Sequence, residues 1–492
     1  MLLSLSTAFS SHAQDTDSEE QPLLLNDAIN RSLSQNLGLK IQRIVPLIED
    51  ESIIQQEAAF DPLLTAKAKR NFGEADYSDI DSTLNREESD DRTYSAGISK
   101  RISTGATLNA GALLSRNDDT SQDGADQTAS YSISITQPLL RDFGSNVSQA
   151  PIKRAQSKRR EADFRLKNQV YDQLQATEFA YWRLADSYER RALRESNIKL
   201  AEDQLAETQE RKNMGMATEL ETLQAESNLA RRNEEIIRAD QAIANAADTL
   251  MAAMGSLDAS LSIENRPAVQ NLVASENAPD PFQEVLSTSL ERNFNAAIQN
   301  EILKQLEQDR ILAENSKRPE VDLNLSSRFG GRSNRNANSA FDRAANRQEE
   351  DWGLELGLSL PWGRRASKSN LRQVDYSIDR AYLRLDEIEQ DLIQSVRTAW
   401  RSLRTTQEQL RAAALVVKLQ QATFDQEMGK YEEGLSSLRD VLETQRDLDN
   451  AVLSFLDAQL STVESEIRLA RAEGTLLERH ALSWESVLDA PQ

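Results

Sequence analysis

Two hydrophobic patterns alternate along the chain, and the first has a period of two residues. Apolar and polar side chains alternate in 321–326 (VDLNLS) and again in 64–69 (LTAKAK). This period predicts strands with one apolar and one polar face. We therefore expect strands within about 62–138 and about 320–361. The clearest apolar face carries Leu354, Leu356, Leu358 and Leu360.

The second pattern is a seven-residue recurrence of apolar residues in the last third of the chain. Its members are Val396, Leu403, Leu410, Val417, Phe424, Tyr431 and Leu438. Seven-residue spacing predicts helices that pack along their length as coiled coils. Gly215 and Gly434 each follow a long helical stretch, and glycine suits the left-handed turn that ends a helix. We expect long helical hairpins at about 151–253 and about 366–475.

A duplication relates the two halves of the chain. Leu33, Asn36, Ile41, Gln42 and Pro62 have matches at an offset of 257, whereas Ala180, Leu200, Gly215, Leu223 and Leu229 have matches at an offset of 219. The offset falls by 38, so the first copy carries 38 extra residues between Pro62 and Gly144. We therefore expect the chain to contain two copies of a unit that consists of a helix, strands and a long helical hairpin.

The expected repeats are 14–254 and 282–480, joined by a linker at 255–281 and followed by a tail at 481–492. Each repeat opens with a helical stretch, at about 26–59 and about 282–317, that ends before a proline.

Long polar connections separate the predicted strands, at 73–93, 116–129 and 330–351. Together with strands of about ten residues, they favour a transmembrane β-barrel with exposed loops, although a soluble sandwich contains similar strands. The extra residues of the first copy predict a further hairpin near Tyr94–Lys100 and Ala106–Leu114. This hairpin either raises the number of barrel strands per chain from four to six or stands above the membrane.

The composition excludes several classes of function. Of the 492 residues, 39% are hydrophobic, 5% aromatic and 28% charged, which is too polar for several thick cores. A net charge of −23 argues against nucleic-acid binding. The chain has no cysteine and only His12 and His480, so thiolate and histidine chemistry are nearly excluded. We expect no catalytic residues, no metal and no cofactor.

The first residues predict export from the cytoplasm. Residues 1–13 contain a short apolar run and a small-x-small pattern of the kind that signal peptidase cleaves, without the usual basic residues. We expect a signal peptide at 1–13.

Several motifs occur in an order that resembles the TolC family of outer-membrane factors. They are AAFDP at 58–62, QPLL at 137–140, NMGMATELE at 213–221 and YEEGLSSLRDVL at 431–442, within the paired copies. The resemblance implies a mainly α-helical chain with a transmembrane β-barrel portion, which assembles as a homotrimer with a shared barrel and a helical coiled-coil tunnel.

The resemblance also implies a function and a location. Such a chain is the outer membrane channel of a tripartite efflux or type I secretion system in a Gram-negative bacterium, extending into the periplasm. Its partners are a periplasmic adaptor, an inner-membrane pump and outer membrane lipid. It is not an enzyme.

Candidate gate residues follow from the same resemblance. The periplasmic narrowing falls on Glu221, Tyr431, Asp440 and Glu443, whereas a basic residue of the gate network falls on Ser436. From the residues alone, rings of acidic side chains around an axis attract cations, and a solvated helix surface is the alternative. The hairpin tips expected to contact an adaptor or pump are Gly215, Met216, Gly434 and Leu435.

Two other functions remain open at this point. A periplasmic coiled-coil adaptor or scaffold without a pore also has a long hairpin, but it has one rather than two. A carboxylate-based hydrolase is conceivable among 80 acidic residues, yet no compact pocket pattern supports it.

Overall fold

The computed structural model describes residues 22–78, 84–119, 126–257, 267–274 and 278–485. The chain divides into two compact units. The helical unit comprises Met1–Ile41, Asn168–Asn293 and Asp391–Gln492, and the sheet unit comprises Gln42–Lys167 and Phe294–Gln390. The signal peptide expected at 1–13 lies outside the described residues.

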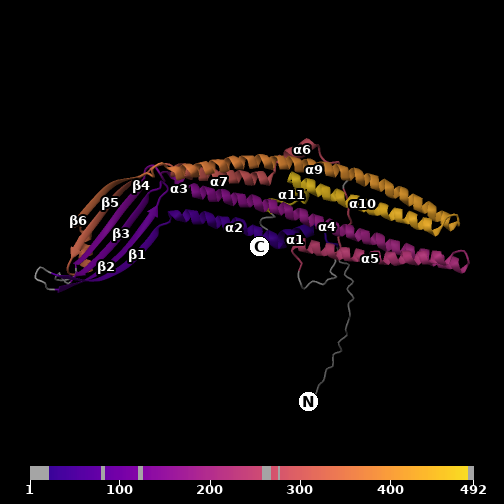
Figure 1. Ribbon diagram of the computed structural model, residues 1–492, viewed down its shortest axis with the longest axis horizontal. Helices are drawn as coiled ribbons and strands as arrows, with labels where there is room; N and C mark the ends of the chain where they lie inside the picture. Colours follow the sequence, from indigo (N-terminus) through magenta and orange to yellow (C-terminus); the bar gives the residue numbers. More distant parts are fainter. Residues whose placement is uncertain (1–21, 79–83, 120–125, 258–266, 275–277, 486–492) are drawn as a thin grey trace, which may run out of the picture. The chain divides into compact units, whose positions relative to one another are not determined.

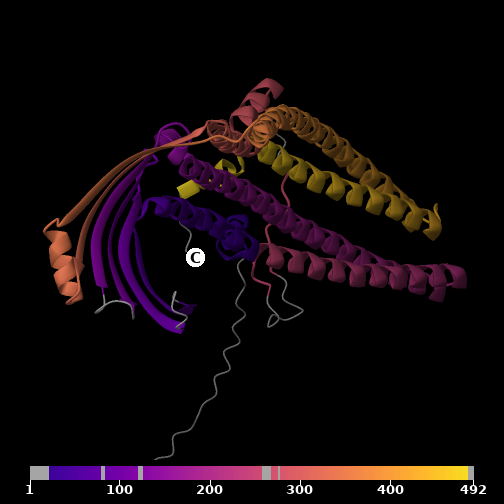
Figure 2. The ribbon, with the colours of Figure 1, turned by 60° about the vertical axis from the view of Figure 1, so that its left-hand side comes forward.

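Six antiparallel strands in chain order form the single sheet of the sheet unit (Figure 1). They are β1 (Leu63–Ser78), β2 (Leu84–Arg101), β3 (Thr107–Asp119), β4 (Asp126–Pro138), β5 (Glu320–Ser333) and β6 (Glu349–Ser359). The extra hairpin of the first copy, β2 and β3, lies inside the sheet between β1 and β4, and does not stand above it. The described residues therefore supply six strands to the sheet, and Figure 2 shows that this sheet is curved.

The strand register gives the sheet one apolar face. Ala96 lies opposite both Ala66 and Ala112, and Ala112 lies opposite Tyr131. Since side chains alternate between faces, these residues share one side with their neighbours two positions along each strand. The apolar face consists of Leu64, Ala66, Ala68, Tyr94, Ala96, Ile98, Leu108, Ala110, Ala112, Leu114, Tyr131, Ile133, Leu325, Trp352, Leu354, Leu356 and Leu358. Leu64 is 77% exposed and Leu358 is 73% exposed, so this face has no cover within the chain at these positions.

Two of the polar segments expected to be loops, 73–93 and 116–129, are strand wherever the structure describes them, so that prediction is wrong for both. Strands β1 and β2 pair as far as Ser78 and Leu84, inside the segment 73–93. The pairing continues because the ladder uses backbone groups, which polar residues supply as well as apolar ones. The third segment, 330–351, contains a helix, α8 (Ala337–Ala345), which begins with an Asn336 cap whose Oδ1 accepts a hydrogen bond from the Ser339 N–H at 2.8 Å.

Helix α8 packs on the apolar face of the sheet. Ala340 and Ala344 are buried, and a Cβ added to Gly331 of β5 would lie 2.4 Å from the carbonyl oxygen of Ala340. The ring of Phe341 lies 5.7 Å from that of Tyr131 on β4. Glycine at position 331 therefore permits the helix to approach the strand closely.

The helices that precede the strands follow the prediction except for one break in each copy. Residues 26–59 were expected to form one helix, but they form α1 (Leu25–Gln35), α2 (Leu37–Glu57) and a short 3-10 turn, η1 (Ala58–Phe60). The chain breaks at Asn36, whose Oδ1 accepts a hydrogen bond from the Leu39 N–H at 3.0 Å. The second copy breaks near the matched Asn293, between α6 (Phe282–Glu291) and α7 (Phe294–Ser316).

The long helices repeat with the offset read from the sequence. Helix α4 (Ala150–Asn213) and helix α9 (Arg365–Glu432) end at positions that differ by that offset of 219. Helices α5 (Glu219–Met254) and α10 (Leu438–Glu473) keep the same offset at both of their ends, while the first residues of β1 and β5 keep the earlier offset of 257. The duplication is therefore visible in the fold. Two short helices, α3 (Ser145–Ser148) and α11 (Leu476–Arg479), complete the described elements.

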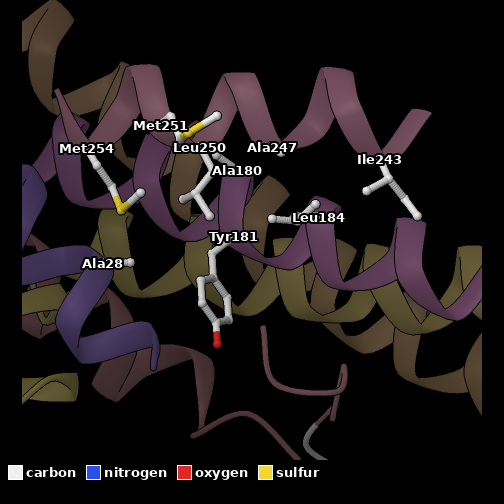
Figure 3. Packing of buried hydrophobic residues seen from close by; sticks show 9 residues of the cluster. All are labelled: Ala28, Ala180, Tyr181, Leu184, Ile243, Ala247, Leu250, Met251 and Met254. Carbon is white, nitrogen blue, oxygen red and sulfur yellow. The ribbon is translucent and has the colours of Figure 1, made fainter. Parts of the chain in front are cut away.

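A buried cluster between α1, α4 and α5 forms one core of the helical unit (Figure 3). Tyr181 is fully buried there, and its hydroxyl donates to the Leu23 carbonyl at 2.7 Å and accepts from the Gln270 N–H at 3.0 Å. The cluster contains Ala28, Ala180, Tyr181, Leu184, Ile243, Ala247, Leu250, Met251 and Met254.

The helices of the described chain do not have the character of membrane spans. None of them is both long enough and apolar enough to cross a bilayer.

Candidate functional site

The two helical hairpins turn with the same backbone geometry. Gly215 and Gly434 have φ values of 74° and 75°, in the left-handed region that glycine adopts without strain. The Met216 N–H bonds the Arg211 carbonyl at 2.8 Å, and the Leu435 N–H bonds the Lys430 carbonyl at 2.8 Å. These bonds close a Schellman motif at the end of each outgoing helix. Both turns therefore follow from a glycine at the same place.

A capping box begins the returning helix of the first hairpin. The Thr218 hydroxyl accepts the Glu221 N–H at 3.2 Å, while the Glu221 carboxylate accepts the Thr218 N–H at 2.6 Å. Two of the unpaired N–H groups at the helix start are satisfied in this way. The predicted gate residue Glu221 is thus held against its own backbone.

The second hairpin has an equivalent box. The Ser437 hydroxyl donates to the Asp440 carboxylate at 2.7 Å, and the Asp440 N–H bonds the same hydroxyl at 3.4 Å. Hydrogen bonds from Ser437 lower the pKa of Asp440. Glu221 and Asp440 were not predicted to complete these boxes, although the Thr-x-x-Glu and Ser-x-x-Asp spacing carries that signal.

Acidic side chains remain exposed on one face of α10. Asp440 and Glu443 are both exposed, and Asp447 continues the same face one turn later. At the tips, Met216 is 62% exposed and Leu435 is 74% exposed. Each tip therefore presents an apolar side chain beside its turn glycine.

Tyr431 is the gate candidate that contacts the other hairpin. It is buried, the Arg211 guanidinium lies 4.5 Å from its ring centroid, and Arg211 Nη1 donates to the Tyr431 carbonyl at 3.3 Å. The contact joins the last turns of α4 and α9 by a cation–π interaction and a hydrogen bond. The surrounding apolar cluster contains Ala225, Phe424, Tyr431, Leu438 and Val441.

Ser436, where the resemblance expects a basic residue, bonds within its own hairpin. Its hydroxyl donates to the carboxylate of Glu427 on α9. Hydrogen bonds from Ser436 and Lys430 lower the pKa of Glu427. A cation does reach Tyr431, but it is Arg211 of the first hairpin, a residue that the sequence analysis did not single out.

Polar residues line the contact between α4 and α10 above the tips. Arg183 donates to Glu464 at 2.8 Å, Arg190 to Asp457 at 2.5 Å, Asn197 to Asp449 at 3.0 Å and Gln204 to Gln445 at 3.5 Å. We call these four pairs the polar seam. Its members on α4 recur every seven residues and end at Arg211 after one further step. This heptad spacing was a readable signal that the sequence analysis missed.

Asp449 of the polar seam also forms a buried ion pair with a residue of a third helix. Arg232 of α5 lies 2.6 Å from Asp449 of α10, and both residues are buried. Burial raises the pKa of Asp449, against the opposing effect of Arg232. The seam therefore joins both hairpins through charges whose desolvation is incompletely compensated. The apolar cluster around Tyr431 also joins the two hairpins, so they are held by both polar and apolar contacts.

The chain resembles known proteins in both sequence and fold. The Outer membrane efflux protein family matches residues 100–256 and 285–475. Outer membrane protein TolC of Escherichia coli (strain K12) is 23% identical over 296 residues, which are 58% of this chain and 58% of that protein. The alignment thus spans less than two thirds of that relative.

Solved structures share the fold over most of the chain. The outer-membrane channel OprN has a TM-score of 0.66 at 16% identity, covering 92% of this chain and 90% of its own. The Campylobacter jejuni CmeC outer membrane channel has a TM-score of 0.65 at 15% identity and covers 99% of both chains.

Proposed function

Because the chain belongs to the outer membrane efflux protein family, we propose that it is the outer membrane channel of a tripartite efflux or type I secretion system. The observation that carries this proposal is the pair of long hairpins with matching turns, attached to a sheet whose exposed face is apolar. Cargo would pass passively through the assembly, from an inner-membrane pump and a periplasmic adaptor to the outside.

The family establishes the setting of the chain. Its members are outer membrane proteins of Gram-negative bacteria that extend into the periplasm, so the predicted localisation is confirmed, as is the prediction that the chain is not an enzyme. The predicted fold, mainly α-helical with a β-barrel portion and a duplicated unit, is also confirmed. We retain the repeats 14–254 and 282–480, with the linker 255–281, as proposed boundaries.

Three copies of the chain would close the sheet. In the described residues, the outer edges of β1 and β6 have no strand partner. Unpaired edges are unfavourable in lipid, where every backbone group needs a partner. We propose that β1 of one copy pairs with β6 of the next, so that six strands from each of three copies make an 18-stranded barrel.

The gate would form where the hairpin tips of three copies meet. Asp440 and Glu443 would supply acidic rings, Glu221 would add a carboxylate from the other hairpin, and Tyr431 would hold the hairpins together through Arg211. Support comes from the exposure of Asp440 and Glu443 and from the burial of Tyr431. Closely spaced carboxylates favour passage of cations over anions.

The gate proposal is tested by single-channel recording of the full-length protein. Glu443→Gln removes a charge without touching either capping box, so we expect a lower preference for cations and unchanged folding. Glu408→Gln, on the exposed surface of α9, is the matched control and should change nothing. Equal cation preference in the wild type and in Glu443→Gln would remove Glu443 from the gate.

Contact with an adaptor is proposed for the tips. Gly215 and Gly434 form the turns, and exposed Met216 and Leu435 offer apolar side chains to a partner. A photo-crosslinking residue at Met216 or Leu435 should capture a periplasmic adaptor in cells. The same residue at Leu415, also exposed on α9, serves as the control. Equal capture at all three positions would contradict a tip-specific contact.

The alternative of a periplasmic adaptor without a pore has no supporting observation. The family match covers parts of both repeats, including the strands β3 and β4. Fractionation of cells separates the two functions directly. Recovery of the chain with the soluble periplasm, rather than with the outer membrane, would contradict the channel.

A further inference from the structure

Three arginines form a row across neighbouring strands on the apolar face of the sheet. The register places Arg70 opposite Arg92, and Arg92 opposite Arg116. They project on the same side as Ala68 and Tyr94, which lie two residues closer to the helical end of their strands. Arg92 and Arg116 belong to β2 and β3, the hairpin that holds the extra residues of the first copy. Two of the three arginines thus lie on the additional hairpin, and Arg70 lies on the neighbouring strand β1.

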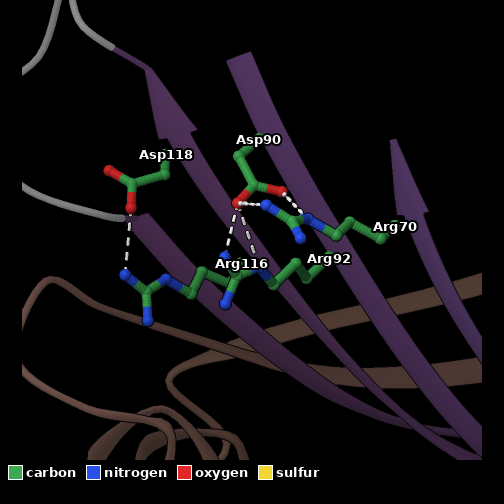
Figure 4. Close-up of polar contacts among 5 residues, drawn as sticks. All are labelled: Arg70, Asp90, Arg92, Arg116 and Asp118. Carbon is green, nitrogen blue, oxygen red and sulfur yellow. Dashed lines mark hydrogen bonds and ion pairs between the residues drawn. The ribbon is translucent and has the colours of Figure 1, made fainter. Parts of the chain in front are cut away.

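Two aspartates partly neutralise the arginine row (Figure 4). Asp90 accepts from Arg70 Nε at 2.8 Å and from Arg92 Nη2 at 2.5 Å, and Asp118 accepts from Arg116 Nη2 at 2.9 Å. Three guanidinium groups against these two carboxylates carry one net positive charge, and the exposed carboxylates of Glu74 and Glu88 lie on the same face two residues beyond Asp90.

The arginine side chains are accessible from outside the chain. The exposed fractions are 62% for Arg70, 36% for Arg92 and 41% for Arg116, whereas Asp90 is only 17% exposed. Asp90 therefore lies beneath the guanidinium groups and holds them in place. Arg70 is thus the most accessible charged group of the row, and Asp118, which is 47% exposed, lies beside Arg116.

The position of the row along the strands lies near a membrane boundary. On β2, the apolar residues of this face lie between Lys100 and Arg92, which are eight residues and therefore about 26 Å apart along the strand. Because barrel strands are tilted by about 35–45°, this length spans about 20 Å along the membrane normal, somewhat less than the apolar band of about 25 Å. Tyr94 is half exposed beside the row, as expected of the aromatic residues that border that band.

The row lies toward the end of the sheet remote from η1 and α3, where the helices begin. Since the helices extend into the periplasm, this boundary faces the outer leaflet, whose headgroups lie at that depth. Guanidinium groups bind phosphate through paired, charge-assisted hydrogen bonds. We propose that Arg70, Arg92 and Arg116 bind the phosphate groups of a phosphorylated lipid headgroup in the outer leaflet. The site depends on the outer membrane location and does not require the conduction proposed above.

The site is tested with the full-length protein reconstituted in phosphatidylcholine vesicles. The vesicles contain either a diphosphorylated glycolipid or the same glycolipid without phosphate, and native mass spectrometry counts the glycolipid retained per protomer after extraction. The wild type should retain the phosphorylated form and lose the dephosphorylated form. The variant R70Q/R92Q/R116Q should retain about tenfold less, as expected from the loss of charge-assisted bonds.

A matched control removes three cations from the opposite face of the sheet. Lys67, Lys69 and Arg328 alternate with residues of the apolar face, so K67Q/K69Q/R328Q should bind glycolipid like the wild type. The variant R70K/R92K/R116K keeps all three charges, and it should retain more glycolipid than the glutamine variant. Inorganic phosphate should not displace the lipid, because the acyl chains anchor it against the apolar face.

Four results would overturn the proposal. They are equal retention of the two glycolipids, unchanged retention by R70Q/R92Q/R116Q, equal losses in the glutamine and lysine variants, and displacement by inorganic phosphate alone. The last result would indicate a site for free phosphate rather than for lipid. Heat-resistant oligomers on gels monitor folding of each variant and keep a folding defect distinct from a binding defect.

Discussion

Arg232 on α5 places its Nη2 atom 2.6 Å from Oδ2 of Asp449 on α10, and both side chains are less than one tenth exposed. Asn197 of α4 donates to the other carboxylate oxygen at 3.0 Å, so three helices from both hairpins meet at this carboxylate. Desolvation opposes this arrangement, because burial raises the pKa of Asp449 even with a guanidinium beside it. The polar seam thus joins the hairpins by a contact of small net stability.

The first prediction concerns the partner of the buried carboxylate. Arg232→Met leaves Asp449 buried without its cation, and we expect a loss of about 3–5 kcal/mol in the free energy of unfolding, seen as a lower Tm. Adding Asp449→Leu removes the unpaired charge and should restore the wild-type Tm or exceed it, because apolar replacement of a buried pair is often neutral or stabilising. If Asp449→Leu does not raise the Tm of Arg232→Met, the unpaired charge of Asp449 is not the cause of the destabilisation.

The second prediction concerns pH. Since the pKa of Asp449 is raised in the folded protein, the folded state binds the proton more tightly than the unfolded state. Above the pKa of Asp449 in the folded state, burial of the charged carboxylate lowers the stability by its full amount. This cost disappears as the pH falls toward the pKa of Asp449 in the unfolded state. Arg232, Arg194 and Asn197 face this group and oppose the shift. The stability of the wild type relative to Asp449→Asn should therefore rise on acidification.

Thermal melts of both proteins between about pH 7 and about pH 4 measure this difference. Comparing the two proteins removes the opposite contributions of Asp440 and Glu427, whose pKa values are lowered. A difference in Tm that stays constant over this range would show that Asp449 does not titrate as inferred.

The third prediction separates two glycines of one hairpin. Gly434→Ala forces an L side chain into a φ of 75° and should destabilise the turn by about 1–2 kcal/mol. Gly429→Ala, five residues earlier inside α9 with no atom near its added Cβ, should instead stabilise the helix by about 0.5–1 kcal/mol. Melting temperatures that move in the same direction for both variants would contradict the turn geometry.

The fourth prediction concerns the contact between α8 and Gly331 on β5. Gly331→Ala brings a Cβ to 2.4 Å from the backbone of α8, and we expect a cost of about 1–3 kcal/mol with faster proteolysis within 334–348. Gly357→Ala on β6 meets nothing closer than 4.0 Å and serves as the control. Equal cleavage of the two variants would show that α8 does not depend on this contact.

The sequence predicted the elements whose periodicity is strong and missed what depends on tertiary contacts. The ends of α4, α5, α9 and α10 lie where the glycines and the offset of 219 placed them. The break at Asn36 was not foreseen, because an amide that bonds both Leu39 and the Ala253 carbonyl is recognisable only once α5 is in place. The polar halves of β1 and β2 were assigned to loops, because their pairing depends on backbone register rather than on hydrophobic alternation.

The candidate gate also combines residues that were predicted from the sequence with contacts that only the structure shows. Tyr431, Asp440, Glu443 and Glu221 were selected by resemblance alone, and their roles in gating stay predictions. The structure adds that Glu221 and Asp440 cap their own helices and that Arg211 lies on Tyr431. Arg211 and Tyr431 belong to different hairpins and lie far apart in the sequence, so no local pattern links them. Only the recurrence of polar residues every seven positions on α4 pointed toward Arg211.

The most direct test of the channel is conductance of the purified full-length protein in a planar bilayer. The account predicts a heat-resistant trimer that inserts in discrete steps and conducts ions with a preference for cations. Because the chain has no native cysteine, cysteines introduced into β1 and β6 should also crosslink neighbouring copies without loss of conductance. A stable monomer that produces no conductance steps would contradict the account.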